Sequence, residues 1–197
     1  ARTPTGILSA EHRNIEKVLA CLERMAGEFE EAGAVVPAPA SDALEFLRTY
    51  ADRLHHGKEE AELFPAMERR GIPEHVGPTA VMRAEHVEGR AHIRAMGEAL
   101  ERNRAGDFVR EARAYVDLLR DHILKEDQVL FPMADGLVPE EEQARLLGVF
   151  DRVEASDVGP AVMTRMLAIR DALCARYGVV DVPRPASGGC SGCCGHG

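Results

Sequence analysis

Residues 55–65 read HHGKEEAELFP, and residues 122–132 read HILKEDQVLFP. Six of the eleven aligned positions are identical, namely His55/His122, Lys58/Lys125, Glu59/Glu126, Leu63/Leu130, Phe64/Phe131 and Pro65/Pro132. In each copy a glutamate follows the histidine by four residues, so on a helix the two side chains stack one turn apart on the same face. The repeat indicates a duplicated two-helix unit.

A second, shorter repeat lies upstream of each copy of the first. The tripeptide AEH occurs at residues 10–12 and again at residues 84–86. His12 and His86 each fall on a helical stripe of apolar residues, which predicts that both imidazoles point into a core. The residues of the two stripes are Leu8, Ile15, Leu19 and Leu22 with His12, and Met82, Ile93, Met96 and Leu100 with His86.

Together the repeats predict a buried polar cluster of four imidazoles and two carboxylates. Its members are His12, His55, Glu59, His86, His122 and Glu126. Two buried carboxylates that face each other repel, and each costs several kcal/mol without a partner, so a positive charge is expected between them. Lys58 and Lys125 lie one position away from the inward face and are expected to reach solvent. A pair of metal ions bridged by the two glutamates is the economical answer, and this donor set suits non-haem iron or, less specifically, manganese or zinc.

The rest of the chain favours an all-α protein. Apolar residues recur at spacings of three and four, and runs rich in Gly and Pro divide the 197 residues into six helical segments. The predicted helices are 5–32, 41–70, 78–103, 107–134, 139–155 and 160–177. Short connections between the first four favour an antiparallel up-down-up-down four-helix bundle over 1–134, with accessory helices over 135–180. Residues 181–197 are rich in Gly, Pro and Cys, which predicts a flexible tail.

Charge and composition limit the partners. The formal net charge is −9, and such an acidic chain is not expected to bind nucleic acid, because phosphates require a positive surface. No apolar run approaches the roughly 18 residues needed to cross a bilayer, and no signal-peptide core opens the sequence, so no membrane partner and a cytoplasmic location are expected. The oligomeric state is left open.

This arrangement of residues resembles that of the hemerythrin-like, or HHE cation-binding, family. The resemblance covers about 5–134 and depends on His12, on the two repeats quoted above and on EHVEGR at 85–90. It implies a di-iron centre in which His12 and His55 serve one iron, His86 and His122 serve the other, and Glu59 and Glu126 bridge them. An oxo or hydroxo group usually completes the bridge in this family.

One departure from the oxygen carriers of this family concerns a fifth histidine. Those proteins carry it four residues after the third one, where this chain has Arg90, and His92 lies off that face. An inward Arg90 would disfavour a cation but could hold an anion. The pattern therefore looks more like the four-His, two-Glu members, which implies binding or processing of O2, NO or peroxide.

The alternatives are an iron-sensing or iron-donating repair module whose tail contacts a protein client, and a metal-free structural bundle. Ferritin-like proteins are excluded because neither repeat has a Glu three residues before its His.

The sequence also predicts where several other His, Glu, Tyr and Cys residues lie. His56 and Glu60 are also four residues apart, but only His55 and Glu59 align with the second repeat, so His56 and Glu60 are expected beside the ligands or in solvent. Tyr50 and Tyr115 either donate hydrogen bonds at the site or only pack, and His75 is expected in an exposed loop. Cys21 and Cys174 are expected in the core, whereas Cys190, Cys193, Cys194 and His196 form a tail cluster with either a metal or redox role or none.

Overall fold

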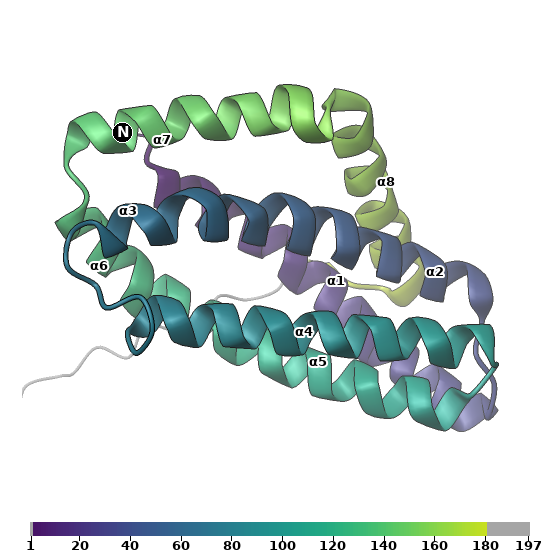
Figure 1. The fold of residues 1–197 in the computed structure, drawn as a ribbon. Coiled ribbons are helices and arrows are strands. Elements are labelled where there is room, and N and C mark those ends of the chain that lie inside the picture. The colour runs from purple at the N-terminus through teal and green to yellow at the C-terminus, as the bar shows by residue number, and fades with distance from the viewer. Residues whose placement is uncertain (1, 181–197) are drawn as a thin grey trace, which may run out of the picture.

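The computed structural model describes residues 2–180, apart from the side chains of 157 and 158, and over this range the chain is helical without a strand (Figure 1). The predicted tail, with Cys190, Cys193, Cys194 and His196, lies outside the described residues. The described elements are α1 (Pro4–Ala32), α2 (Pro37–Phe46), η1 (Leu47–His56), η2 (Glu59–Leu63), α3 (Phe64–Glu68), α4 (Pro78–Glu101), α5 (Ala105–Lys125), η3 (Glu126–Leu130), α6 (Phe131–Leu137), α7 (Glu140–Arg152), η4 (Val153–Val158) and α8 (Pro160–Tyr177).

These elements join into six helical stretches, as the sequence predicts, because η1 to η4 are π-helical turns within longer helices. The second stretch begins at Pro37, four residues earlier than predicted. A proline in the first turn needs no hydrogen-bonded N–H, so the segment PAPAS starts a helix and does not form a linker. Thr3 caps the first helix by accepting a hydrogen bond from the backbone N–H of Gly6 at 3.0 Å.

Four long stretches lie lengthwise beside one another (Figure 1). They are α1, the run from α2 to α3, α4, and the run from α5 to α6. Helix α5 packs against both α1 and α4, and α2 packs against α1 and α4. Helix α7 runs along the top of the view and contacts α1, and α8 packs on α1 and α2.

The apolar core consists of two clusters. One contains Ile15 of α1 and Ile93 of α4, and the other contains Leu8 of α1 and Met82 of α4. Along α1 and α4 the buried histidines fall between the members of the two clusters. The accessory helices contribute to both, because Phe150 of α7 packs in the second cluster and residues of α8 pack in the first. A polar layer therefore separates two apolar layers.

Among the described residues no helix has both the length and the apolar composition needed to span a bilayer.

Candidate metal centre

All six residues expected in the polar cluster lie in one buried layer. His12 comes from α1, His86 from α4, His55 and Glu59 from the second helical stretch, and His122 and Glu126 from the fourth; each is at most 1% exposed. Their donor atoms, together with those of the neighbouring His56, form two overlapping groups compatible with metal binding. One contains His12, His55, Glu59 and Glu126, and the other contains His56, Glu59, His86 and His122.

The imidazoles are arranged as two pairs. His12 Nε2 lies 3.0 Å from His55 Nε2, and His86 Nε2 lies 3.1 Å from His122 Nε2. Two adjacent donors on one ion, each bonded at about 2.1 Å, stand about 3 Å apart. The spacing within each pair therefore matches two ligands of a single metal ion.

Each glutamate spans both pairs with its two oxygens. Glu126 Oε2 lies 3.1 Å from His12 Nε2, and its Oε1 lies 3.3 Å from His122 Nε2. Glu59 Oε1 lies 3.5 Å from His55 Nε2, and its Oε2 lies 3.5 Å from His86 Nε2. In this arrangement both carboxylates could bridge two ions, one held by each imidazole pair.

A carboxylate holds the other ring nitrogen of every histidine in the two pairs. His12 Nδ1 lies 2.9 Å from Asp127, and His55 Nδ1 lies 3.0 Å from Glu11. In the other half, His86 Nδ1 contacts Glu60 at 2.7 Å and His122 Nδ1 contacts Glu85 at 2.9 Å. Because a carboxylate accepts, each Nδ1 carries the proton, and each Nε2 of a neutral imidazole presents a lone pair.

In neutral imidazoles with this tautomer, the two Nε2 lone pairs of each pair would point at one another. The two Nε2 atoms of each pair are 3.0 or 3.1 Å apart, and at this distance their lone pairs repel unless a proton or another cation lies between them. Both oxygens of Glu59 and one oxygen of Glu126 are also buried without a hydrogen-bond donor. A cation in each half would satisfy the nitrogens and the carboxylates together, so the residues present fit a two-metal centre.

The electrostatics of the metal-free cluster show the same deficit of positive charge. Burial and the neighbouring Glu126 carboxylate raise the pKa of Glu59 well above its ordinary value. Burial alone would raise the pKa of Glu126 too, but His122 and His12 hold it well below the usual range. Without a metal, the layer therefore disfavours the charged form of Glu59 and favours that of Glu126.

We did not predict from the sequence that these four carboxylates support the histidines. Of the four, a position was predicted only for Glu60, which was expected beside the ligands or in solvent. Glu11 and Glu85 directly precede His12 and His86, while Glu60 and Asp127 directly follow Glu59 and Glu126. The signal was present in the sequence, because an acidic residue adjoins a candidate ligand at the same place in both repeats. What helix periodicity could not show is that each carboxylate supports a histidine on a different helix.

The phenylalanine of each LFP motif packs against a histidine ring from the other two-helix unit. The ring of Phe64 stacks near His86 with centroids 5.9 Å apart, and the ring of Phe131 stacks on His12 with centroids 5.4 Å apart. Aromatic faces on the imidazoles keep water away from the ligand nitrogens. The motif therefore closes the polar layer on one side.

The prediction that Lys58 reaches solvent is wrong. Its side chain is fully buried, and its Nζ lies 2.5 Å from Glu11 and 2.6 Å from Glu154 of η4, with the ring of Phe150 at 5.3 Å. The accessory segment covers this lysine. Lys125, its counterpart in the second repeat, pairs with Glu85 but keeps 43% of its side chain exposed.

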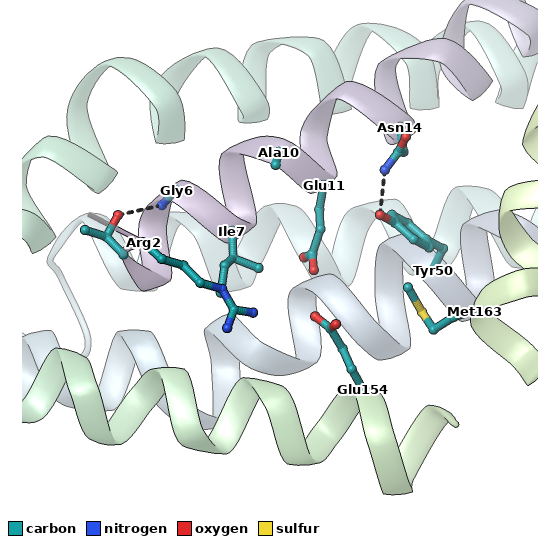
Figure 2. A pocket seen from close by; sticks show the side chains of 10 residues that line it. Arg2, Gly6, Ile7, Ala10, Glu11, Asn14, Tyr50, Glu154 and Met163 are labelled. Atoms are coloured by element: carbon teal, nitrogen blue, oxygen red, sulfur yellow. Dashed lines mark hydrogen bonds between the residues drawn. The ribbon is translucent and has the colours of Figure 1, made fainter. Parts of the chain in front are cut away.

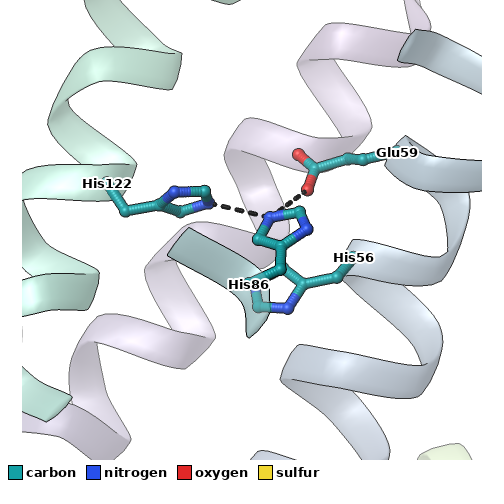
Figure 3. A group of neighbouring side chains, drawn as sticks. All are labelled: His56, Glu59, His86 and His122. Carbon is teal, nitrogen blue, oxygen red and sulfur yellow. Dashed lines mark hydrogen bonds and ion pairs between the residues drawn. The ribbon is translucent and has the colours of Figure 1, made fainter. Parts of the chain in front are cut away.

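His56 lies inside the layer, beside the candidate ligands. It is 4% exposed, and its ring stacks on that of His86 with centroids 3.8 Å apart and planes 15° apart (Figure 3). An imidazole binds a metal ion that lies in the plane of its ring. The planes of two stacked, nearly parallel rings do not meet close to the rings, so both rings cannot bind the same ion. In this arrangement His56 packs against the candidate ligand His86, and its ring is not directed at the position that an ion between His86 and His122 would take.

In a regular α-helix, Val129 would share the inward face of His122 and Glu126, and the sequence pattern predicts it there. In the structure Val129 is 55% exposed, so this prediction is wrong. The cause is η3, the π-helical turn that begins at Glu126. A π turn holds more residues than an α turn, so side chains after it rotate away from the α-helical stripe. Glu59 begins the corresponding turn η2, and such turns are frequent at functional sites.

The remaining polar neighbours take structural positions. Arg90 does not point at the cluster: it is partly exposed and binds Asp52 at 2.7 Å and Glu60 at 2.9 Å. His92 pairs with Glu111 at 2.9 Å outside the layer, and His75 is exposed as expected. Tyr50 accepts a hydrogen bond from Asn14 at 2.8 Å, whereas the buried Tyr115 hydroxyl has no partner, so neither donates to the six residues.

A surface pocket of about 460 Å³ reaches the layer from the side of the accessory helices (Figure 2). Glu11 and Glu154 approach each other across it, and Tyr50 and Met163 line its other end. Glu11 also holds His55 Nδ1, so this carboxylate both lines the pocket and contacts the first imidazole pair.

Comparison with known protein families also indicates cation binding. The model of the hemerythrin HHE cation-binding domain matches residues 3–134, which include all six residues of the cluster. No curated protein and no solved structure matches the chain.

Proposed function

Because the chain belongs to the hemerythrin HHE cation-binding domain family, we propose that it binds two iron ions in the buried layer. His12 and His55 hold one ion, His86 and His122 hold the other, and Glu59 and Glu126 bridge them. The observation that carries the proposal is the convergence of the four Nε2 atoms, since every one of these imidazoles has its Nδ1 tied to a carboxylate. The hemerythrin-like up-down-up-down bundle over residues 1–134 belongs to the same proposal, supported by the packing of α1, α2, α4 and α5.

The protein supplies each ion with two imidazole nitrogens and two carboxylate oxygens. Iron of this type accepts up to six donors, so positions remain for a bridging oxygen and for a small external ligand. Binding or processing of O2, NO or peroxide is the activity that such open positions support. The chain's own residues orient the ligands, exclude bulk water and set the basicity of the imidazoles through the four supporting carboxylates.

The pocket beside Glu11 is the proposed approach for that small ligand. It opens to solvent and ends at the carboxylate that supports His55. We therefore place ligand entry on the side of the His12–His55 pair.

Iron content and thermal stability test the proposal together. The protein loaded with ferrous iron without oxygen is expected to hold two irons per chain. It should gain oxo-bridge absorption when oxygen or peroxide is added, and its absorption spectrum should change when NO binds. Removal of the iron by a chelator is expected to lower Tm on the order of 10 °C, because the lone pairs and carboxylates lose their cation.

Fewer than about one iron per chain, with Tm unchanged by the chelator, would contradict metal binding and favour a structural bundle. Among metal-binding outcomes, a reversible oxygen adduct would indicate a carrier and consumption of NO or peroxide an enzyme. Transfer of iron to a metal-free client protein would instead support the iron-donating alternative.

The stacking of His56 gives a prediction that separates it from the ligands. His56→Phe keeps a flat ring against His86 and removes both nitrogens, so this variant is expected to retain two irons per chain. His86→Phe is the matched change on the neighbouring ring, and it is expected to lose iron. Loss of an iron in the His56 variant, measured by metal analysis after desalting, would show that His56 turns toward the ion when metal is bound.

A further inference from the structure

Two thiols meet where the last helix packs on the first. Cys21 of α1 and Cys174 of α8 are 153 residues apart in sequence, and their sulfur atoms lie 3.9 Å apart. Cys21 is fully buried, whereas Cys174 is half-buried. The described residues contain no other cysteine.

Polar contacts on both sides of the pair hold α8 in place on α1. Before it, Arg170 donates to the side-chain oxygen of Asn14 at 2.5 Å. After it, Arg176 pairs with Glu28 at 3.0 Å, and Arg24 donates to the Tyr177 carbonyl at 2.5 Å. The helices are therefore fixed against sliding, and the two sulfurs stay opposed.

We propose that Cys21 and Cys174 form a peroxide-sensitive thiol pair, in which oxidation of Cys174 is resolved by Cys21 into a disulfide that links α8 to α1. The sulfurs, 3.9 Å apart, need to approach by about 1.8 Å to reach bonding distance. This inference does not depend on the metal centre.

Exposure and hydrogen bonding assign the order of the two steps. Burial and the adjacent Cys174 raise the pKa of Cys21 to about 12, so Cys21 stays protonated, and its S–H points at Cys174 Sγ as donor. Cys174 is the thiol that solvent reaches and that receives this hydrogen bond. It is therefore the first nucleophile.

Both steps balance with one hydroperoxide as the oxidant. The Cys174 sulfur attacks the terminal oxygen, an S–O bond forms as the O–O bond breaks, and the leaving alkoxide or hydroxide takes the thiol proton to give a sulfenic acid and an alcohol or water. The Cys21 sulfur then attacks the Cys174 sulfur. The S–S bond forms, the S–O bond breaks, and the departing hydroxide leaves as water with the proton from Cys21.

The expected result is measured in the full-length chain carrying Cys190→Ser, Cys193→Ser and Cys194→Ser, so that only the proposed pair can react. After treatment with hydrogen peroxide, both thiols should disappear from a thiol titration, and the intact mass should fall by two hydrogen atoms. The disulfide closes a loop of more than 150 residues, so Tm should rise on the order of 10 °C and return to its starting value with a reductant.

Two single changes in this background act as controls. Cys21→Ala keeps Cys174 but removes the resolving thiol, so peroxide should leave Cys174 as sulfenic or sulfinic acid, with a mass gain and no rise in Tm. Cys174→Ser should leave Cys21 reduced under the same treatment. The proposal is overturned if, with both cysteines present, peroxide leaves two free thiols or carries Cys174 to the sulfinic acid without the disulfide.

Discussion

Replacing Glu59 with alanine is expected to remove both irons, whereas removal of one ligand histidine, as in His122→Ala, weakens its own half first. The reason is that the two oxygens of Glu59 face different imidazole pairs, each at 3.5 Å. Metal analysis of the purified variants should find close to two irons per chain in the parent and less than about half an iron in Glu59→Ala.

The isosteric change Glu59→Gln separates charge from volume. It should lose iron as the alanine variant does, yet the metal-free form should unfold no more easily than the metal-free parent. Burial already disfavours the charge on Glu59 when no cation is present, so an amide of the same shape costs little there. Thermal unfolding in a chelator measures this difference.

His75→Ala and His92→Ala are the controls for iron content, because both side chains lie outside the layer. Both should keep two irons per chain. Retention of both irons in Glu59→Ala would contradict the bridging role. Loss of iron in either control would show that histidines outside the layer contribute to binding.

The second large effect concerns Lys58. In metal-free protein Lys58→Ala is expected to lower the free energy of unfolding by about 3 kcal/mol, because it leaves the buried Glu11 carboxylate without its cation and detaches Glu154 of η4. The matched change Lys125→Ala should cost less than about 1 kcal/mol, since that lysine is 43% exposed. Urea unfolding of the three proteins makes the comparison.

A double variant distinguishes the lost charge pair from lost packing. Lys58→Met with Glu11→Gln removes the lone charge at Glu11 and preserves both volumes, and the Glu154 carboxylate that it leaves unpaired is 33% exposed to solvent. The double variant should therefore recover most of the stability that Lys58→Ala loses. Equal losses in Lys58→Ala and Lys125→Ala would contradict the claim that the accessory segment buries the first lysine. A double variant as unstable as Lys58→Ala would assign the loss to packing.

Much of the fold and of the candidate site could be predicted because each inference concerned one helix at a time. Breaker residues marked six helical stretches, and the spacing of four residues put His55 with Glu59 and His122 with Glu126 on common faces. The duplication added the remaining step, since equivalent residues of two similar units lie in equivalent places.

The errors arise where one helix leaves the α-helical period or meets another element. The π turn at Glu126 rotates Val129 out to solvent, and no spacing rule for an α-helix anticipates that rotation. Lys58 and Lys125 occupy equivalent places in the repeat. Only Lys58 is buried, because Glu154 and Phe150 of the accessory segment cover it.

By itself, the sequence determined the helical class, the two repeats and the identity of the six candidate ligands, since these follow from spacing along single helices. The tertiary structure decided which carboxylate supports which imidazole, which lysine is buried, where the ring of His56 lies and that Cys21 meets Cys174. Each of these depends on the distance between side chains from different helices. Periodicity along one helix carries no information about that distance, and only the packing of the helices sets it.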